Sequence, residues 1–134
     1  MGGLAHGDNI TALGGLRGKP YAISRVGSED HALAMTVMSA KGVDRPEVNF
    51  VAVGMPTVRV QALIANRMSA TTTTIGTWVT IRTQPGVKIL VQPDNFWNTA
   101  PLMGNTSAAT TAIARDKSEE LRRYSNAMLQ TQRA

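Results

Sequence analysis

The sequence contains no cysteine, and its aromatic residues number two each of Phe, Trp and Tyr in 134 residues. The absence of cysteine excludes disulfides, thiolate nucleophiles and cysteine-based zinc sites. So few aromatic residues predict a core built from aliphatic side chains. No apolar run approaches the roughly 18 residues that span a bilayer, and the first residues lack the basic start and apolar stretch of a signal peptide. We therefore expect a soluble protein with no membrane partner, made where it works.

Acidic residues are also few, and their distribution is uneven. The chain has 14 Lys and Arg against 9 Asp and Glu, giving a formal charge of +5 and a sequence pI near 10.2. Such an excess suits nucleic acid, an anionic surface or an acidic protein as partner. Between Val48 and Pro93 there is no acidic residue at all. That segment is the candidate basic surface.

Glycine, proline and charge divide the chain into four parts. Residues 1–20 are rich in glycine, which is costly to order without a partner, and are interpreted as a flexible or assembly arm. Residues 21–92 are interpreted as an antiparallel β domain. Residues 93–106 form a connecting loop, and residues 107–134 form a C-terminal helix. The expected fold class is therefore mainly β, as an α+β protein.

Alternating and β-branched segments predict five or six short antiparallel strands. Segment 57–65 alternates apolar and polar residues, and segment 71–83 is rich in threonine, which favours strands. Segments 31–38 and 48–53 flank a loop with Gly42 and Pro46, which predicts a hairpin. The other expected strands cover residues 21–26 and 87–91.

The end of the chain has the clearest helical pattern. Thr106 or Ser107 can cap a helix, and residues 108–130 contain neither glycine nor proline. Glu119 precedes Arg122 by three and Arg123 by four residues, an orientation that supports a helix. The apolar stripe is thin, so we expect it to pack against a neighbour. The predicted assembly interface combines this stripe with two aromatic residues of the connecting loop: Ile113, Leu121, Tyr124, Met128, Phe96 and Trp97.

No recognisable constellation for catalysis or metal binding is present. The two histidines, His6 and His31, lie near acidic residues but show no metal-ligand spacing. Glu29 and Asp30 are adjacent, so on a strand their carboxylates would point to opposite faces and a turn is the simpler interpretation. We expect no enzyme, no metal and no cofactor.

The acid-free segment supplies candidate contacts for nucleic acid. A sheet face with basic and amide side chains and one exposed aromatic can bind phosphates and stack a base. The alternative is that the basic residues are merely solvated and that the tryptophan belongs to the core. The candidate nucleic-acid-binding residues are Arg59, Gln61, Arg67, Trp78, Arg82 and Lys88.

In its expected order of elements the chain resembles the coat proteins of single-stranded RNA phages. The resemblance rests on segments 31–38, 41–46 and 48–53 as a hairpin, on segment 71–83, and on the helix after Ser107. It implies an antiparallel sheet, dimerisation by exchange of helix and sheet, and RNA bound on the sheet. It departs from the family in the glycine-rich arm and in having one long helix where two shorter ones are typical.

Two functions are therefore expected from the sequence. The first is a structural protein of a phage virion, either a capsid coat or a capsid-decorating or head–tail joining protein. It would self-assemble as a homo-oligomer, contact other virion proteins and genomic nucleic acid, and be made in the host cytoplasm. The alternative is a small basic β-sheet regulator that binds nucleic acid.

Overall fold

The computed structural model describes residues 2–6, 10–99 and 106–133, which fall into two compact units. Unit 1 is Met1–Leu102 and unit 2 is Met103–Ala134. Unit 1 contains two short 3₁₀ turns, Leu13–Leu16 and Arg45–Glu47. Its strands and helices follow in the order β1 (Gly2–His6), β2 (Pro20–Ile23), α1 (Glu29–Ala40), β3 (Asn49–Ala52), α2 (Pro56–Ile64), β4 (Ala70–Thr73), α3 (Ile75–Ile81), β5 (Val87–Val91) and α4 (Pro93–Thr99).

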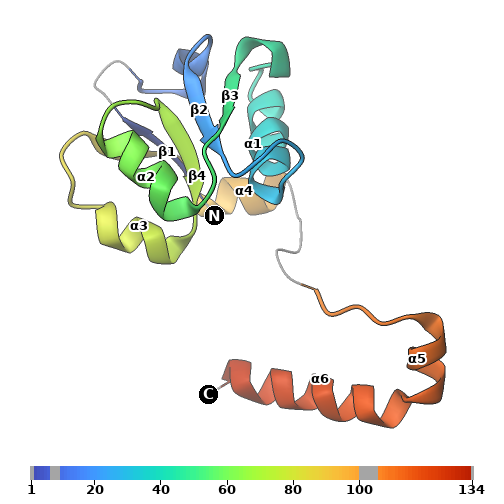
Figure 1. Ribbon diagram of the computed structural model, residues 1–134. Helices are drawn as coiled ribbons and strands as arrows, with labels where there is room; N and C mark the ends of the chain where they lie inside the picture. The colour runs from blue at the N-terminus through green and yellow to red at the C-terminus, as the bar shows by residue number, and fades with distance from the viewer. Residues whose placement is uncertain (1, 7–9, 100–105, 134) are drawn as a thin grey trace. The chain divides into compact units, whose positions relative to one another are not determined.

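The five strands form one mixed sheet in the order β3-β2-β4-β1-β5. β2 is parallel to both of its neighbours, β3 and β4, whereas β1 is antiparallel to β4 and β5. Parallel neighbours need crossover connections, and α1 and α2 supply them between β2, β3 and β4 (Figure 1). The predicted antiparallel sheet is therefore wrong. Residues 2–6 of the predicted arm form β1, between β4 and β5.

Helices pack on both faces of this sheet. On one face, Ala34 and Met38 of α1 join Tyr21 and Ile23 of β2 in a buried cluster. A second cluster unites α2 and α3 with the partly buried Val87 and Ile89 of β5. The unit thus has three layers, helix, sheet and helix.

Segment 31–38, predicted as a strand, lies inside α1. Its buried apolar residues Leu33, Ala34, Val37 and Met38 are spaced by one, three and one, which matches one face of a helix. The predicted hairpin with segment 48–53 is therefore absent, and β3 instead pairs in parallel with β2.

Segments 57–65 and 71–83 were also predicted as strands. The first forms α2, which begins with Pro56 and buries Val60 and Leu63 three residues apart. The second is split, because Thr74 ends β4 and caps α3 by accepting a hydrogen bond from the N–H of Thr77 at 3.4 Å. The threonine-rich sequence led to the prediction of one long strand. The last of these threonines, Thr74, instead caps the helix that follows β4.

Unit 2 consists of α5 (Thr111–Asp116) and α6 (Ser118–Arg133), so the single long helix expected here is interrupted at Lys117. The predicted ion pairs of Glu119 with Arg122 and Arg123 are confirmed at 2.7 and 3.5 Å. No helix in the described part of the chain is long and apolar enough to cross a membrane. The predicted division into four parts with separate roles, at residues 20, 92 and 106, stays a prediction.

Candidate functional site

A cleft of about 490 Å³ opens where the three parallel strands end. Its walls are the connections that follow β2, β3 and β4 and lead into α1, α2 and α3. The carboxyl ends of parallel strands are the usual place for ligands in open α/β sheets. The lining residues are Ser24, Arg25, Ser28, Glu29, Asp30, Gly54, Met55, Pro56, Arg59, Thr72, Thr73 and Thr74.

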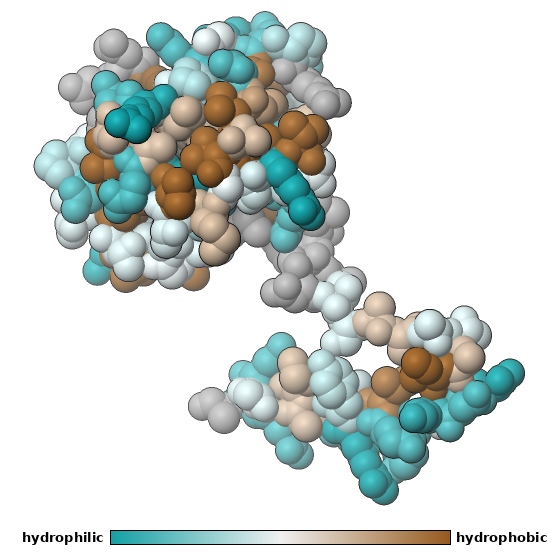
Figure 2. Space-filling model, in the orientation of Figure 1, coloured by the Kyte–Doolittle hydropathy of each residue, from teal (hydrophilic) through white to brown (hydrophobic). Residues whose placement is uncertain are grey.

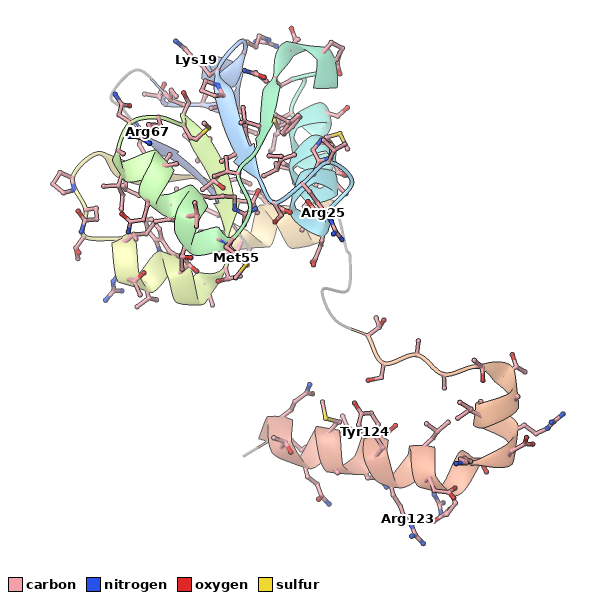
Figure 3. The ribbon with its side chains drawn as sticks, in the orientation of Figure 1. Lys19, Arg25, Met55, Arg67, Arg123 and Tyr124 are labelled. Carbon is pink, nitrogen blue, oxygen red and sulfur yellow. The ribbon has the colours of Figure 1, made fainter. Side chains whose placement is uncertain are left out.

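Local chain geometry brings these connections together. Gly54 has a φ of 101°, a conformation that only glycine adopts readily, and it turns the chain from β3 into α2. Arg25 and Met55 both lie in the lower half of unit 1 in Figure 3, although they are 30 residues apart in the sequence.

A buried ion pair forms the floor of the cleft. The Asp30 carboxylate accepts hydrogen bonds from the Ser24 N–H at 2.8 Å, the Ser28 hydroxyl at 2.5 Å and Nη1 of Arg59. The same Arg59 nitrogen donates to the Ser24 hydroxyl at 2.9 Å. Burial alone would raise the pKa of Asp30, but the hydrogen bonds from Ser28 and Ser24 and the charge of Arg59 together hold that pKa below its usual value.

Two polar atoms at the cleft are buried without a partner. Among the described residues, Arg59 Nε and Thr73 Oγ1 are the buried side-chain nitrogen and oxygen atoms that lack a hydrogen bond. Each of these two residues is only 3 % exposed. A buried polar group left unpaired costs about 1–3 kcal/mol, so its presence in a cleft points to a ligand.

The amino end of α2 adds positive electrostatic potential to the cleft. This helix of nine residues has no side-chain cap, and its N-terminus lies at the cleft beside Met55 and Pro56. The first N–H groups of a helix have no partner within it and favour negative charge. The cleft therefore combines the positive end of the α2 dipole with the unpaired Arg59 N–H and Thr73 hydroxyl, a set that fits an oxygen-rich anionic group.

Exposed apolar side chains lie in or beside the connections that form the cleft. Val26, Met55 and Ile75 are the most exposed large hydrophobic side chains of the described residues, at 68–70 %. Each lies in or directly after the connection that follows one of the parallel strands. Figure 2 shows hydrophobic residues, in brown, among hydrophilic ones on the visible face of unit 1. Such side chains suit the carbon skeleton of a ligand whose polar group enters the cleft.

The unpaired hydroxyl gives a stability prediction. Thr73→Val removes an unpartnered buried group and keeps the side-chain shape, so we expect the free energy of unfolding to stay unchanged or rise by about 1 kcal/mol. Thr71→Val is the matched control in the same strand, because the Thr71 hydroxyl donates to the Ala22 carbonyl at 2.9 Å. The control should lose about 1 kcal/mol in urea denaturation. An equal loss in both variants would show that Thr73 has a partner in the free protein.

The residues predicted to bind nucleic acid do not share a sheet face. Arg59 is buried in the ion pair, whereas Gln61 on α2 and Arg67 after it are exposed. Trp78 on α3 packs partly buried against the cluster around Leu63. Arg82 is exposed after α3, and Lys88 is half-buried on β5. Neither of them lines the cleft. Their residue-level assignment stays a prediction, although most of the strand faces on which it rested are helices.

The residues predicted for an assembly interface lie on both units. Ile113, Tyr124 and Met128 are 45–49 % exposed, and Leu121 is half-buried within unit 2. The Tyr124 hydroxyl lies 3.4 Å from that of Ser107. The final two predicted positions, Phe96 and Trp97, belong to α4, but their side chains fall outside the described part of the structure. The interface role of all six residues stays a prediction.

Sequence reasoning missed most of the cleft. Asp30 was interpreted as part of a turn, and Ser24, Ser28 and Thr73 were not considered. The available signal was a short strand followed by Gly27, then Ser28 and two acidic residues, which is typical of a chain turning from a strand into a helix.

A family model described as NMT1/THI5 like matches residues 4–133 of this chain. The chain belongs to the NMT1/THI5-like family. No curated protein matches it. The family assignment overturns the resemblance to phage coat proteins, which depended on the hairpin that the structure replaces with α1.

Solved structures show the same fold. The periplasmic aliphatic sulphonate binding protein SsuA from Escherichia coli superposes with a TM-score of 0.65 at 17 % identity, over 85 % of this chain and 35 % of that one. The alkanesulfonate-binding protein SsuA from Xanthomonas axonopodis pv. citri, bound to MOPS, gives 0.60 at 18 % identity, over 67 % and 31 %. A protein from Bordetella bronchiseptica RB50 gives 0.63 at 18 %, over 73 % and 33 %. The chain spans about a third of the length of these structures.

These findings correct the functional predictions from the sequence. A virion structural protein, a homo-oligomeric capsid and a nucleic-acid-binding regulator are all wrong for a member of this family. The predicted partners, other virion proteins and genomic nucleic acid, and the predicted location in a virion made in the host cytoplasm, are wrong with them. The error has a physical origin, since the arginines of the basic segment were assigned to exposed strands and instead lie in or directly after α2 and α3.

Proposed function

We propose that this chain provides a ligand-binding lobe of a periplasmic solute-binding protein that serves an ABC transporter. The observation that carries the proposal is the cleft, where Arg59 Nε and Thr73 Oγ1 are buried without partners beside the uncapped start of α2. These groups would bind the oxygens of an anionic group. In this role the chain binds its solute and does not convert it.

The proposed solute class is an aliphatic sulfonate. A sulfonate presents three acceptor oxygens and one negative charge, which matches donors at the cleft floor. Its alkyl part would contact the exposed apolar side chains of Val26, Met55 and Ile75. Two structural neighbours are sulfonate-binding proteins by name, which supports the same class.

Isothermal titration with methanesulfonate and butanesulfonate tests this proposal. We expect both to bind, and butanesulfonate to bind more tightly because its added methylene groups bury apolar surface. Thr73→Val should weaken both by about tenfold, the effect of losing one hydrogen bond to a charged group. Thr71→Val should leave the affinities unchanged, because its hydroxyl is already bonded to the Ala22 carbonyl. Absence of heat with either sulfonate, or equal binding by Thr73→Val and the unaltered chain, would contradict the proposal.

A further inference from the structure

The cleft is electrically balanced although the whole chain is basic. Its lining contains two cationic side chains, Arg25 and Arg59, and two acidic ones, Glu29 and Asp30, so their formal charges sum to zero. The two pairs differ in exposure. Arg25 and Glu29 are exposed at the rim, where water screens them, whereas Arg59 and Asp30 are buried together at the floor.

Asp30 affects the charge of the cleft as well as the stability of the fold. Its carboxylate accepts hydrogen bonds from Arg59, the Ser24 N–H and the Ser28 hydroxyl. An anionic ligand would use donors of the same kind. The charge of Arg59 is therefore already compensated before a ligand enters. An incoming anion is left with the neutral hydroxyl of Thr73, the positive end of the α2 dipole and the Arg59 Nε–H, which has no partner within the described residues.

We infer that Asp30 is a specificity-determining residue, which makes the cleft accept a group with one negative charge and reject a group with two. The inference rests on the proposed function. One charge on the ligand is offset by the donors that remain free. A second charge meets the buried Asp30 carboxylate, and the repulsion is strong because little water lies between them to screen it.

Methanesulfonate and methylphosphonate form a matched pair of probes for this inference. They have nearly the same shape, and above its second pKa methylphosphonate has two charges and no proton to donate to Asp30. Tyr21 interacts electrostatically with Asp30 and Arg59. It stays neutral just above the second pKa of methylphosphonate, since burial raises the pKa of Tyr21 to about 12. The measured quantity is the ratio of the two dissociation constants, obtained by titration calorimetry on the full chain.

For the unaltered chain we expect methanesulfonate to bind at least about tenfold more tightly than the phosphonate dianion. Asp30→Asn removes the charge while keeping an oxygen near the Ser24 N–H, and it should reduce the preference by about tenfold. Asp44→Asn is the matched control, the same change at an exposed position outside the cleft lining, and should leave the ratio unchanged. Because both probes are measured on one preparation, any loss of folded protein in a variant cancels in the ratio.

The possible outcomes separate this inference from the proposed function. Equal affinity of the unaltered chain for both probes contradicts the inference and leaves sulfonate binding intact. If Asp30→Asn weakens both probes equally, Asp30 only positions its neighbours and the inference is also wrong. Binding of neither probe contradicts the proposed function, and the inference falls with it.

Discussion

Arg59→Met is expected to lower the free energy of unfolding by about 3–5 kcal/mol, as is typical when one partner of a buried ion pair is removed. The loss arises because Asp30 remains buried at the cleft floor without its cationic partner, while the Ser24 hydroxyl loses a donor at 2.9 Å. Urea denaturation followed by circular dichroism measures the change.

A double-mutant cycle supplies the control for this prediction. Asp30→Asn combined with Arg59→Met leaves no buried charge, so the pair should lose clearly less than the sum of the two single changes. Arg82→Met, at an exposed position after α3, should change stability by no more than about 0.5 kcal/mol. A loss below about 1 kcal/mol for Arg59→Met would mean that water reaches the ion pair.

Leu63→Ala should cost about 2–5 kcal/mol, the range observed when a buried leucine is truncated. Leu63 is fully buried and packs with Val60 and Ile81 between α2 and α3. Removing its side chain leaves a cavity where α2 meets the sheet. Thermal and urea denaturation measure the loss.

Val79→Ala is the matched control, because Val79 lies on α3 but is 53 % exposed. It should change stability by no more than about 0.5 kcal/mol. If Leu63→Ala also has so small an effect, α2 does not cover the sheet and the three-layer arrangement is contradicted.

Some elements of the fold could be predicted from the sequence. The strand at Val87–Val91 and the strand within residues 48–53 were expected, because short β-branched runs between turn residues favour strands in any context. The ion pairs of α6 also followed from spacing along one helix. Each of these features depends on neighbours in the sequence alone.

The parallel sheet could not be derived from the same patterns. In residues 57–64, apolar residues alternate as they do in a strand, yet Val60 and Leu63 also fit the face of a helix. A short segment satisfies both periods, and packing in the folded unit decides between them. Once α1 and α2 are assigned as strands, the crossovers disappear and only an antiparallel sheet remains.

The candidate site depends on contacts between distant residues. Arg59 was selected for its charge, but its partner Asp30 lies 29 positions earlier, on another helix. Nothing in the spacing of a single sequence indicates that pair. The unpartnered hydroxyl of Thr73 can likewise be recognised only when the surroundings of β4 are known. Thr71, Thr72 and Thr73 are the same residue type and differ only in their hydrogen bonds.

The central claim is that the cleft at the carboxyl ends of β2, β3 and β4 binds the solute. A titration of the isotope-labelled chain with methanesulfonate, followed by NMR of the backbone amides, tests it most directly. We expect shift changes concentrated in the connections that line the cleft, at residues 24–30, 54–59 and 72–74. Shift changes confined to other residues, such as those of α6, or none at saturating sulfonate, would contradict it.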